Sequence, residues 1–504
     1  ASPAAADTLR EALLQAYATN PTITGARAGQ RAIDENVPIA LSQGRPNLIG
    51  TGQYLENVLD TGSDSGTDLD ASPRRSVSAN LELEFPIYQG GAVRNGVRAA
   101  ERRVEGGRAE LRSTEANLFV DVVTAYMDVI SNRNIVELNA NQVGVLSTEF
   151  QATSDRFEIG DLTRTDVAQA QARLATAQAN LETAEADLIA TEELYLRLVG
   201  ERPGVLEPPP PLPALPETPD QAEDVAVEEN PNLVSAEREA EAVRRDIDVA
   251  EAQRLPRLSA VASGGYNNFL GSLGGAASNQ FAQSSASVSV GLRATVPLYQ
   301  GGEPSARVRQ QTANFGRAQE FVIETERAVV ANARSAFSRY RAGLDNIQSA
   351  QVAVDANTLA LEGVRAENSV GLRTIIEVLN AQQELLNSQV SLVTARRNAY
   401  VAGFTLLAAM GRAEARDLGL DGGVLYDPVA NYERVRGIWS DWDDDPIPPV
   451  EATRTVDVPL IGPIDPRAVG SGTPPVVVPT PPATYQNPVT SPPDSGMNRP
   501  DGGH

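Results

Sequence analysis

Two stretches of the chain alternate between apolar and polar side chains, a pattern typical of β-strands with one apolar face. Every second residue of 77–87 is apolar, and Ser, Asn, Glu or Pro stands at the positions between. Residues 288–298 repeat this alternation, with Ser, Gly, Arg, Thr or Pro between the apolar residues. The alternation predicts strands over 76–88 and 285–299.

Both predicted strands lead into the same motif, Pro-x-Tyr-Gln-Gly-Gly, and then into a long helical pattern. The two copies differ in residue number by 211, and the same offset relates Gly160 to Gly371 and Gly200 to Gly411. We expect the glycines to allow tight turning of the backbone from strand to helix. The residues of these junctions are Pro86, Tyr88, Gly90 and Gly91 in the first copy and Pro297, Tyr299, Gly301 and Gly302 in the second.

The long helical patterns carry apolar residues at seven-residue intervals, such as Val129, Val136 and Val143. This spacing predicts coiled-coil packing between long neighbouring helices. A helix over 92–158 would be on the order of 100 Å long at a rise of about 1.5 Å per residue. A compact globular core does not need helices of this length.

The offset of 211 indicates a tandem duplication of a helix, two strands, a long helix and a shorter helix. The first repeat spans 1–200, with a helix over 7–44, strands over 46–58 and 76–88, and helices over 92–158 and 162–199. A Pro-rich linker over 201–219 follows. The second repeat spans 220–411, with a helix over 220–254, strands over 256–268 and 285–299, and helices over 303–369 and 372–410. Residues 412–442 form an apolar docking segment, and the Pro-rich tail over 443–504 is expected to be disordered.

The composition excludes most catalytic chemistry. The chain has no Cys and no Lys, and its one His is the last residue, His504. The commonest general base, the commonest nitrogen ligand for metals and the Schiff-base amine are therefore missing. We predict that the protein is not an enzyme and has no catalytic residue, metal or cofactor. The net charge of -24 argues against nucleic acid as a partner.

No segment approaches the roughly 18–20 continuous apolar residues of a membrane helix. The first residues resemble a mature start after removal of a signal peptide, although a truncated chain would look the same. Four strands per chain would leave two unpaired edges, whereas the smallest closed membrane barrels have about eight strands. Two architectures satisfy these patterns: a coiled-coil rod carrying a soluble sheet, or several chains that complete one barrel continuous with a helical tube.

The order of elements and three motifs resemble the TolC family of outer-membrane channel tunnels. The junction motif stands twice, the stretch 369–381 (SVGLRTIIEVLNA) is similar to the family's second periplasmic helix turn, and 156–160 with Thr165-Asp166-Val167 is similar to the first. The resemblance implies a fold that is mainly α with a membrane β-barrel. Three chains would form a 12-stranded barrel and a 12-helix coiled-coil tunnel, spanning from the outer membrane of a Gram-negative bacterium into the periplasm.

The function implied is the exit duct of a type I secretion or multidrug efflux system, a passive conduit opened at its periplasmic end. Its partners would be two further chains of a homotrimer, a periplasmic adaptor protein, an inner-membrane pump (ABC transporter or proton-driven) and outer-membrane lipid. The alternative is a structural or adhesive coiled-coil protein of the cell envelope without a pore.

The resemblance also implies residue roles. A periplasmic gate network would comprise Thr165, Asp166, Asn368 and Arg373, where Asn368 replaces a Tyr of the best-known members. The pore constriction would be lined by Glu377 and Asn380 in place of two rings of Asp, which predicts weaker cation selectivity. The alternative is that these charges are solvated helix-end groups. Tyr88 and Tyr299 would form an aromatic girdle or would pack the junction between barrel and tunnel.

Overall fold

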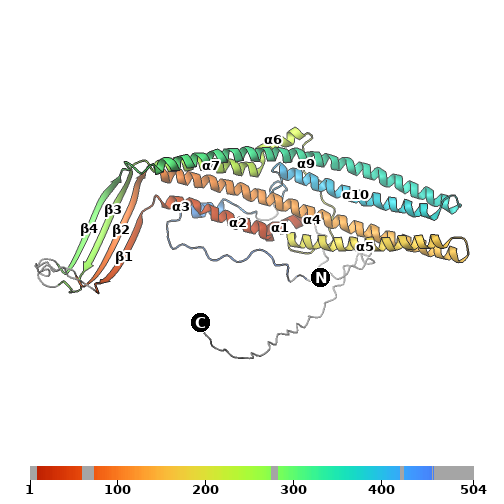
Figure 1. Cartoon of the computed structure of the whole chain (residues 1–504), viewed down its shortest axis with the longest axis horizontal. Coiled ribbons are helices and arrows are strands. Elements are labelled where there is room, and N and C mark those ends of the chain that lie inside the picture. Colours follow the sequence, from red (N-terminus) through yellow and green to blue (C-terminus); the bar gives the residue numbers. More distant parts are fainter. Residues whose placement is uncertain (1–7, 59–72, 274–281, 421–424, 457, 459–504) are drawn as a thin grey trace, which may run out of the picture. The chain divides into compact units, whose positions relative to one another are not determined.

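The computed structural model describes residues 8–58, 73–273, 282–420, 425–456 and 458. These residues fall into one large unit that ends at Asp457 and a second unit from Val458 onward. The large unit contains all the helices and strands described below (Figure 1). The predicted N-terminal start and most of the predicted disordered tail lie outside the described residues.

The helix predicted over 7–44 is three helices: α1 (Leu9–Thr19), α2 (Pro21–Asp34) and α3 (Asn36–Ser42). The first break occurs because Asn20 is extended and its side chain caps α2 by accepting a hydrogen bond from the Thr22 amide. The second break precedes Pro38, which has no N–H to donate to the carbonyl of residue 34.

The helix predicted over 220–254 is likewise divided, into α6 (Pro219–Glu229) and α7 (Pro231–Ala252). Asn230 separates them and caps α7 as Asn20 caps α2. The Asn-Pro pair therefore ends one helix and begins the next in both halves of the chain.

Each half continues with a long helix and a shorter one. They are α4 (Ala92–Glu158) with α5 (Arg164–Val199), and α9 (Glu303–Ser369) with α10 (Ile375–Ala409). The shorter helices begin two and three residues later than the sequence predicts, because Thr163 and Thr374 are extended N-cap residues. Within the described residues, no helix combines the length and apolarity needed to cross a bilayer.

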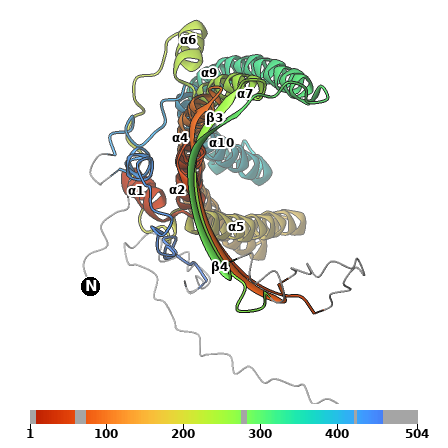
Figure 2. The same ribbon diagram turned by 90° about the vertical axis from the view of Figure 1, so that its left-hand side faces the viewer.

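The four strands form one antiparallel sheet in the order β1 (Asn47–Glu56), β2 (Arg75–Gln89), β3 (Arg257–Asn268) and β4 (Ser284–Thr295). Leu48, Leu83, Ala262 and Val290 lie opposite one another across the sheet, so the alternating apolar positions of β2 and β4 share one face. Ile49 and Leu55 of β1 and Val261 of β3 lie on the opposite face, where Ile49 pairs with Glu82 and Val261 with Glu84. In the view along the helices the sheet curves as an open arc (Figure 2).

β4 ends at Thr295, four residues before the end predicted at 299. Thr295 pairs with Arg257, and the residue before Arg257 is Pro256, which has no N–H to extend the ladder. β2 continues to Gln89 because an irregularity between Pro86 and Tyr88 shifts its register on the same neighbour.

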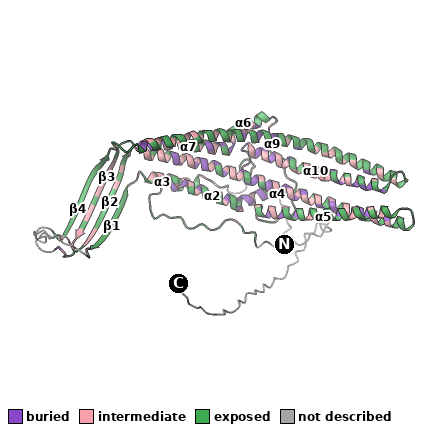
Figure 3. Ribbon diagram, viewed as in Figure 1, coloured by how far each residue is buried: buried purple, intermediate pink, exposed green. Residues whose placement is uncertain are grey.

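Burial is unequal in the two halves. α4 and α9 each have 67 residues, but 21 residues of α4 are buried and only 7 of α9. The largest apolar cluster draws residues from α1, α2, α4, α5, α6, α9 and α10. Figure 3 shows buried residues gathered in the middle of the helical region. All residues of β1 and β4 are exposed. One side of α9 and both sheet edges therefore have no cover within the described part of the chain.

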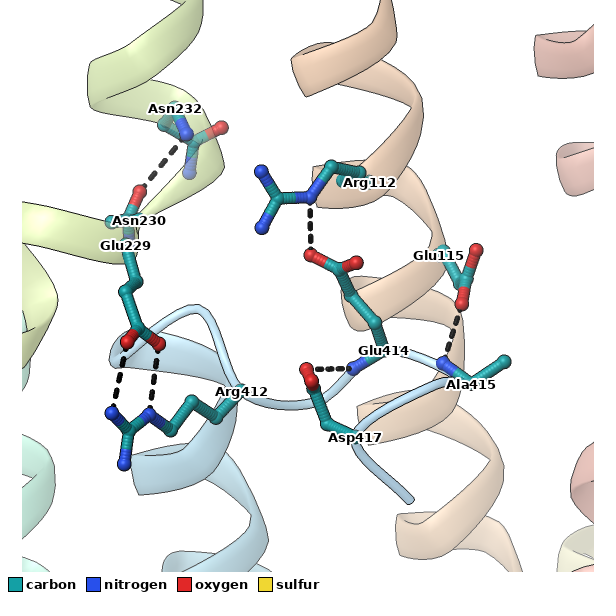
Figure 4. Close-up of polar contacts among 9 residues, drawn as sticks. All are labelled: Arg112, Glu115, Glu229, Asn230, Asn232, Arg412, Glu414, Ala415 and Asp417. Atoms are coloured by element: carbon teal, nitrogen blue, oxygen red, sulfur yellow. Dashed lines mark hydrogen bonds and ion pairs between the residues drawn. The ribbon is translucent and has the colours of Figure 1, made fainter. Parts of the chain in front are cut away.

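The chain leaves α10 through a segment, 412–417, that polar side chains attach to both halves (Figure 4). Arg412 forms a paired hydrogen bond with Glu229 at 2.8 and 2.9 Å. Glu414 binds Arg112 of α4, and the Ala415 amide donates to Glu115 of α4 at 2.6 Å. The short helix α11 (Ala430–Val435) then packs on α2. Within the predicted docking segment, residues 412–420 thus contact α4 of the first half and α6 of the second, and α11 contacts α2 of the first half.

Candidate functional site

The first strand–helix junction is packed against the second half of the chain. Gly90 has a φ of +63°, and a Cβ at this position would lie 2.8 Å from Leu255 Cβ and 2.9 Å from the Ala252 carbonyl oxygen. Gly91, with a φ of +87°, is the N-cap of α4. Both the left-handed backbone and the close approach of α7 therefore require glycine at position 90.

The second junction has the same backbone, but within the described residues nothing packs on its first glycine. Gly301 has a φ of +62°, and no atom lies within 4 Å of the position its Cβ would take. Tyr299 is 89% exposed, whereas Tyr88 is 50% exposed. Pro86 and Pro297 precede the two tyrosines in the same order. The two junctions thus share their conformation and differ in their surroundings.

At the turn between α9 and α10, Arg373 lies between two carboxylates. Its Nε donates to Glu367 at 2.7 Å and its Nη1 donates to Glu377 at 2.7 Å. The Asn368 amide donates to the Arg373 carbonyl at 2.8 Å. Three of the predicted site residues, Asn368, Arg373 and Glu377, are therefore brought together at this turn.

Glu377 has a second role at the same turn. Its Oε2 accepts hydrogen bonds from the backbone N–H and the hydroxyl of Thr374, at 2.8 and 2.9 Å, which forms a capping box at the start of α10. The Thr374 amide, the Arg373 guanidinium and the Thr374 hydroxyl lower the pKa of Glu377 from 4.5 to about 2. Glu377 is therefore ionised and paired with a cation near neutral pH.

The turn between α4 and α5 is built in the same way. Thr163 caps α5, and Asp166 accepts from the Thr163 hydroxyl at 2.6 Å and from its backbone N–H at 2.9 Å. These bonds lower the pKa of Asp166. Thr165 is exposed beside it. Asp166 thus bonds within its own turn, and no hydrogen bond or ion pair joins it to Arg373 among the described residues.

Comparison with known proteins decides the family. The family model described as outer membrane efflux protein matches residues 12–201 and, a second time, residues 224–412. The chain belongs to the outer membrane efflux protein family. The two matches correspond to the two halves in which helices, strands and helices follow in the same order.

Curated members of this family are similar over most of their length. The chain is 34% identical to the outer membrane efflux protein BepC of Brucella suis biovar 1 (strain 1330), over 86% of this chain and 92% of BepC. It is 27% identical to the outer membrane protein TolC of Escherichia coli (strain K12), over 85% and 87% of the two chains. It is 28% identical to the alkaline protease secretion protein AprF of Pseudomonas aeruginosa, over 68% and 72%. The predicted membership of the TolC family and the predicted function class, efflux or secretion through the outer membrane, are confirmed.

Solved structures of outer-membrane channels share the fold. The Campylobacter jejuni CmeC outer membrane channel superposes with a TM-score of 0.71 at 15% identity, over 85% of this chain and 89% of that one. The outer membrane protein VceC of Vibrio cholerae superposes with a TM-score of 0.68 at 20% identity, over 80% and 96%. The predicted fold class is confirmed at this level, as a mainly helical efflux-channel fold.

One contact of this efflux-family chain was missed in the sequence. The Arg173 Nη2 of α5 donates to Asn380 Oδ1 of α10 at 2.8 Å, so the second predicted constriction residue joins the two helical hairpins. No local pattern links residues 207 positions apart. The two capping threonines, by contrast, had a visible signal, since Thr163 and Thr374 each stand three residues before an acidic residue.

Proposed function

We propose that three copies of this chain form an exit duct across the outer membrane into the periplasm, built from two tandem repeats per chain. The observation that carries this proposal is that both sheet edges are unpaired and that few residues of α9 are buried. β1 and β4 are edge strands of a sheet in which the alternating apolar positions of β2 and β4 share one face, and only 7 of the 67 residues of α9 are buried. Open edges in lipid are prohibitive, so the strands need neighbours on both sides.

The repeat itself supplies the geometry of closure. Within one chain, β2 pairs with β3, and α7 packs on α4 and covers Gly90. If the second half of one chain meets the first half of the next chain as the two halves of one chain meet each other, β4 pairs with β1 of the next chain. This arrangement also brings α2 and α3 of the next chain onto the free side of α9 and onto Gly301. Both uncovered features of the second half would then receive the cover that the first half already has.

In such a trimer, four strands and four long helices from each chain would make a 12-stranded barrel and a 12-helix tunnel. The apolar face of the sheet would meet outer-membrane lipid. The opposite face carries Glu82 and Glu84, with Arg293 at 3.8 and 3.9 Å from their carboxylates, and would line a polar lumen. The tyrosines of the two junctions would lie near the inner lipid boundary.

The gate would lie at the two helical turns. Asn368 and Arg373 at one turn and Thr165 and Asp166 at the other would form its network. Arg373 already binds two carboxylates within its own turn, so exchange of these partners would accompany opening. Exposed ion pairs contribute only about 0–1 kcal/mol each, which suits a gate that a docking protein must release.

Glu377 and Asn380 would line the constriction. Because Glu377 is paired with Arg373 in each chain, its ring would attract cations less strongly than free carboxylates do. The duct would be passive, and a periplasmic adaptor and an inner-membrane pump, either an ABC transporter or a proton-driven pump, would supply energy and substrate choice. The relatives BepC and AprF are named for efflux and for protease secretion respectively.

The test is a conductance measurement on the purified protein in planar lipid bilayers. We expect a heat-resistant trimer that inserts with a small, steady conductance, and Arg373→Ser should raise that conductance. Arg365→Ser, an exposed arginine of α9, is the matched control and should leave it unchanged. A soluble rod that never inserts would refute the duct and favour the structural coiled-coil alternative. An insertion-competent trimer indifferent to Arg373→Ser would refute the gate assignment alone.

A further inference from the structure

The two helical hairpins of one chain meet mainly where α10 packs on α4, and near their turns α10 also contacts α5. Beneath the surface, a small apolar cluster joins all four long helices there, through Leu146, Ala177, Leu361 and Leu379 among others. Above it, the Arg173–Asn380 hydrogen bond spans from one hairpin to the other. This bond is charge-assisted, since the guanidinium donates to the amide oxygen.

Away from the turns, α5 and α10 carry further polar residues at seven-residue intervals from Arg173 and Asn380. Asn180 and Asp187 follow Arg173 at seven-residue intervals, and Asn387 follows Asn380 by seven. These three residues line a groove of about 470 Å³ between α4, α5 and α10. Residues seven apart lie on one face of a helix in a coiled coil. Arg173 and Asn380 therefore close the end of a polar seam between α5 and α10.

We propose that Arg173 and Asn380 form a clasp between the hairpins, and that the closed state of the duct depends on it. The proposal rests on the proposed function, because closure has a meaning only in a duct. In this role Arg173 is a gating residue that acts apart from the bonds Arg373 makes at its own turn. Moving one hairpin away from the other must break the clasp, whereas bonds within a turn travel with it.

The repeat extends the clasp to the neighbouring chain. With the offset of 211, Glu384 stands where Arg173 stands in the first half, and Gln169 stands where Asn380 stands in the second. Glu384 is exposed on α10. In a ring closed by the repeat relation, Glu384 would accept a hydrogen bond from the side-chain amide of the next chain's Gln169. Contacts that contain a cation, Arg173, and contacts that contain an anion, Glu384, would then alternate around the ring.

The first experiment is single-channel conductance of the full trimer carrying Arg173→Gln, Asn380→Ala or both. Each single variant should raise the time-averaged conductance by roughly twofold or more, and the double variant should add little, because all three lack the same bond. Asn380→Asp converts the clasp into an ion pair and should lower the time-averaged conductance. Arg164→Gln, which removes the same charge from the exposed start of α5, is the matched control.

A second experiment reads the clasp without relying on conductance. The chain has no Cys, so Arg173→Cys with Asn380→Cys provides a unique pair for a reducible bifunctional thiol reagent. We expect efficient cross-linking within one chain, loss of transport in the linked protein and recovery after reduction. Unlinked cysteines, or unchanged conductance in Arg173→Gln with a wild-type trimer that inserts normally, would overturn the clasp alone. Failure of the wild-type protein to insert would overturn the proposed function instead.

Discussion

The two junction glycines allow a sharp test of how chains cover one another. Gly90 and Gly301 have nearly the same φ, +63° and +62°, so alanine costs about 1–2 kcal/mol of backbone strain at either position. At position 90 the new Cβ also meets Leu255 Cβ at 2.8 Å and a backbone oxygen at 2.9 Å. Overpacking of this kind adds about 1–3 kcal/mol.

For an isolated chain, we therefore expect Gly90→Ala to destabilise by about 2–5 kcal/mol and Gly301→Ala by only about 1–2 kcal/mol. The difference corresponds to roughly 5- to 150-fold in the folding equilibrium. In the proposed trimer, the next chain would cover Gly301 as α7 covers Gly90. The cost of Gly301→Ala should then rise to that of Gly90→Ala and appear as lost trimer.

The assay is denaturant unfolding of the detergent-solubilised protein, together with the fraction of heat-resistant trimer on gels. Gly144→Ala is the control, because it adds a Cβ within α4 where no atom lies within 4 Å, and it should be neutral or stabilising by up to about 1 kcal/mol. A trimer in which Gly301→Ala remains clearly milder than Gly90→Ala would refute closure by the repeat relation. A mild effect of both would refute the steric reasoning.

Three further outcomes are expected. Gln382→Leu should raise the free energy of unfolding by about 1–3 kcal/mol in denaturant titrations, because the Gln382 amide is buried and neither of its polar atoms has a partner among the described residues. Asn230→Ala should lower it by about 1–3 kcal/mol, since Asn230 caps α7 and donates to the Ala409 carbonyl. Acidification should raise the bilayer conductance only as the pH falls through about 2, because the pKa of Glu377 is lowered to about 2 and its ion pair with Arg373 is lost on protonation.

Controls separate each cause. Asn230→Asp keeps the cap and removes only the donor, so its loss should be intermediate; a loss equal to that of Asn230→Ala would show that the cap contributes nothing. Destabilisation by Gln382→Leu would mean that the amide is bonded in the trimer. Glu377→Gln should abolish the rise in conductance on acidification, and persistence of the rise would assign it to another group.

Much of the fold followed from local pattern. Strict alternation places apolar side chains on one face of a strand, and seven-residue spacing places them along one stripe of a helix. Both the alternation and the seven-residue spacing are visible in the sequence alone. Helix starts were less accurate, because the capping boxes of Thr163 and Thr374 decide where α5 and α10 begin, and helical periodicity continues through them.

The site was only partly predictable. The motif around Arg373 indicated the turn, but the pairing of Arg373 with Glu367 depends on how the chain reverses there. Asn380 was identified through the resemblance alone, and its partner Arg173 was not identified. Two side chains on separate hairpins meet only when both helices have packed on a common cluster.

The sequence by itself predicted the elements and the order in which they recur, because periodicity is a local property, and its residue inventory lacks Cys and Lys. The tertiary structure decided the order of the strands, the packing of α7 against Gly90 and the unequal burial of α4 and α9. These depend on contacts between the two halves. Two nearly identical junctions, one covered and one open, differ only in what packs against them, and no local pattern records that difference.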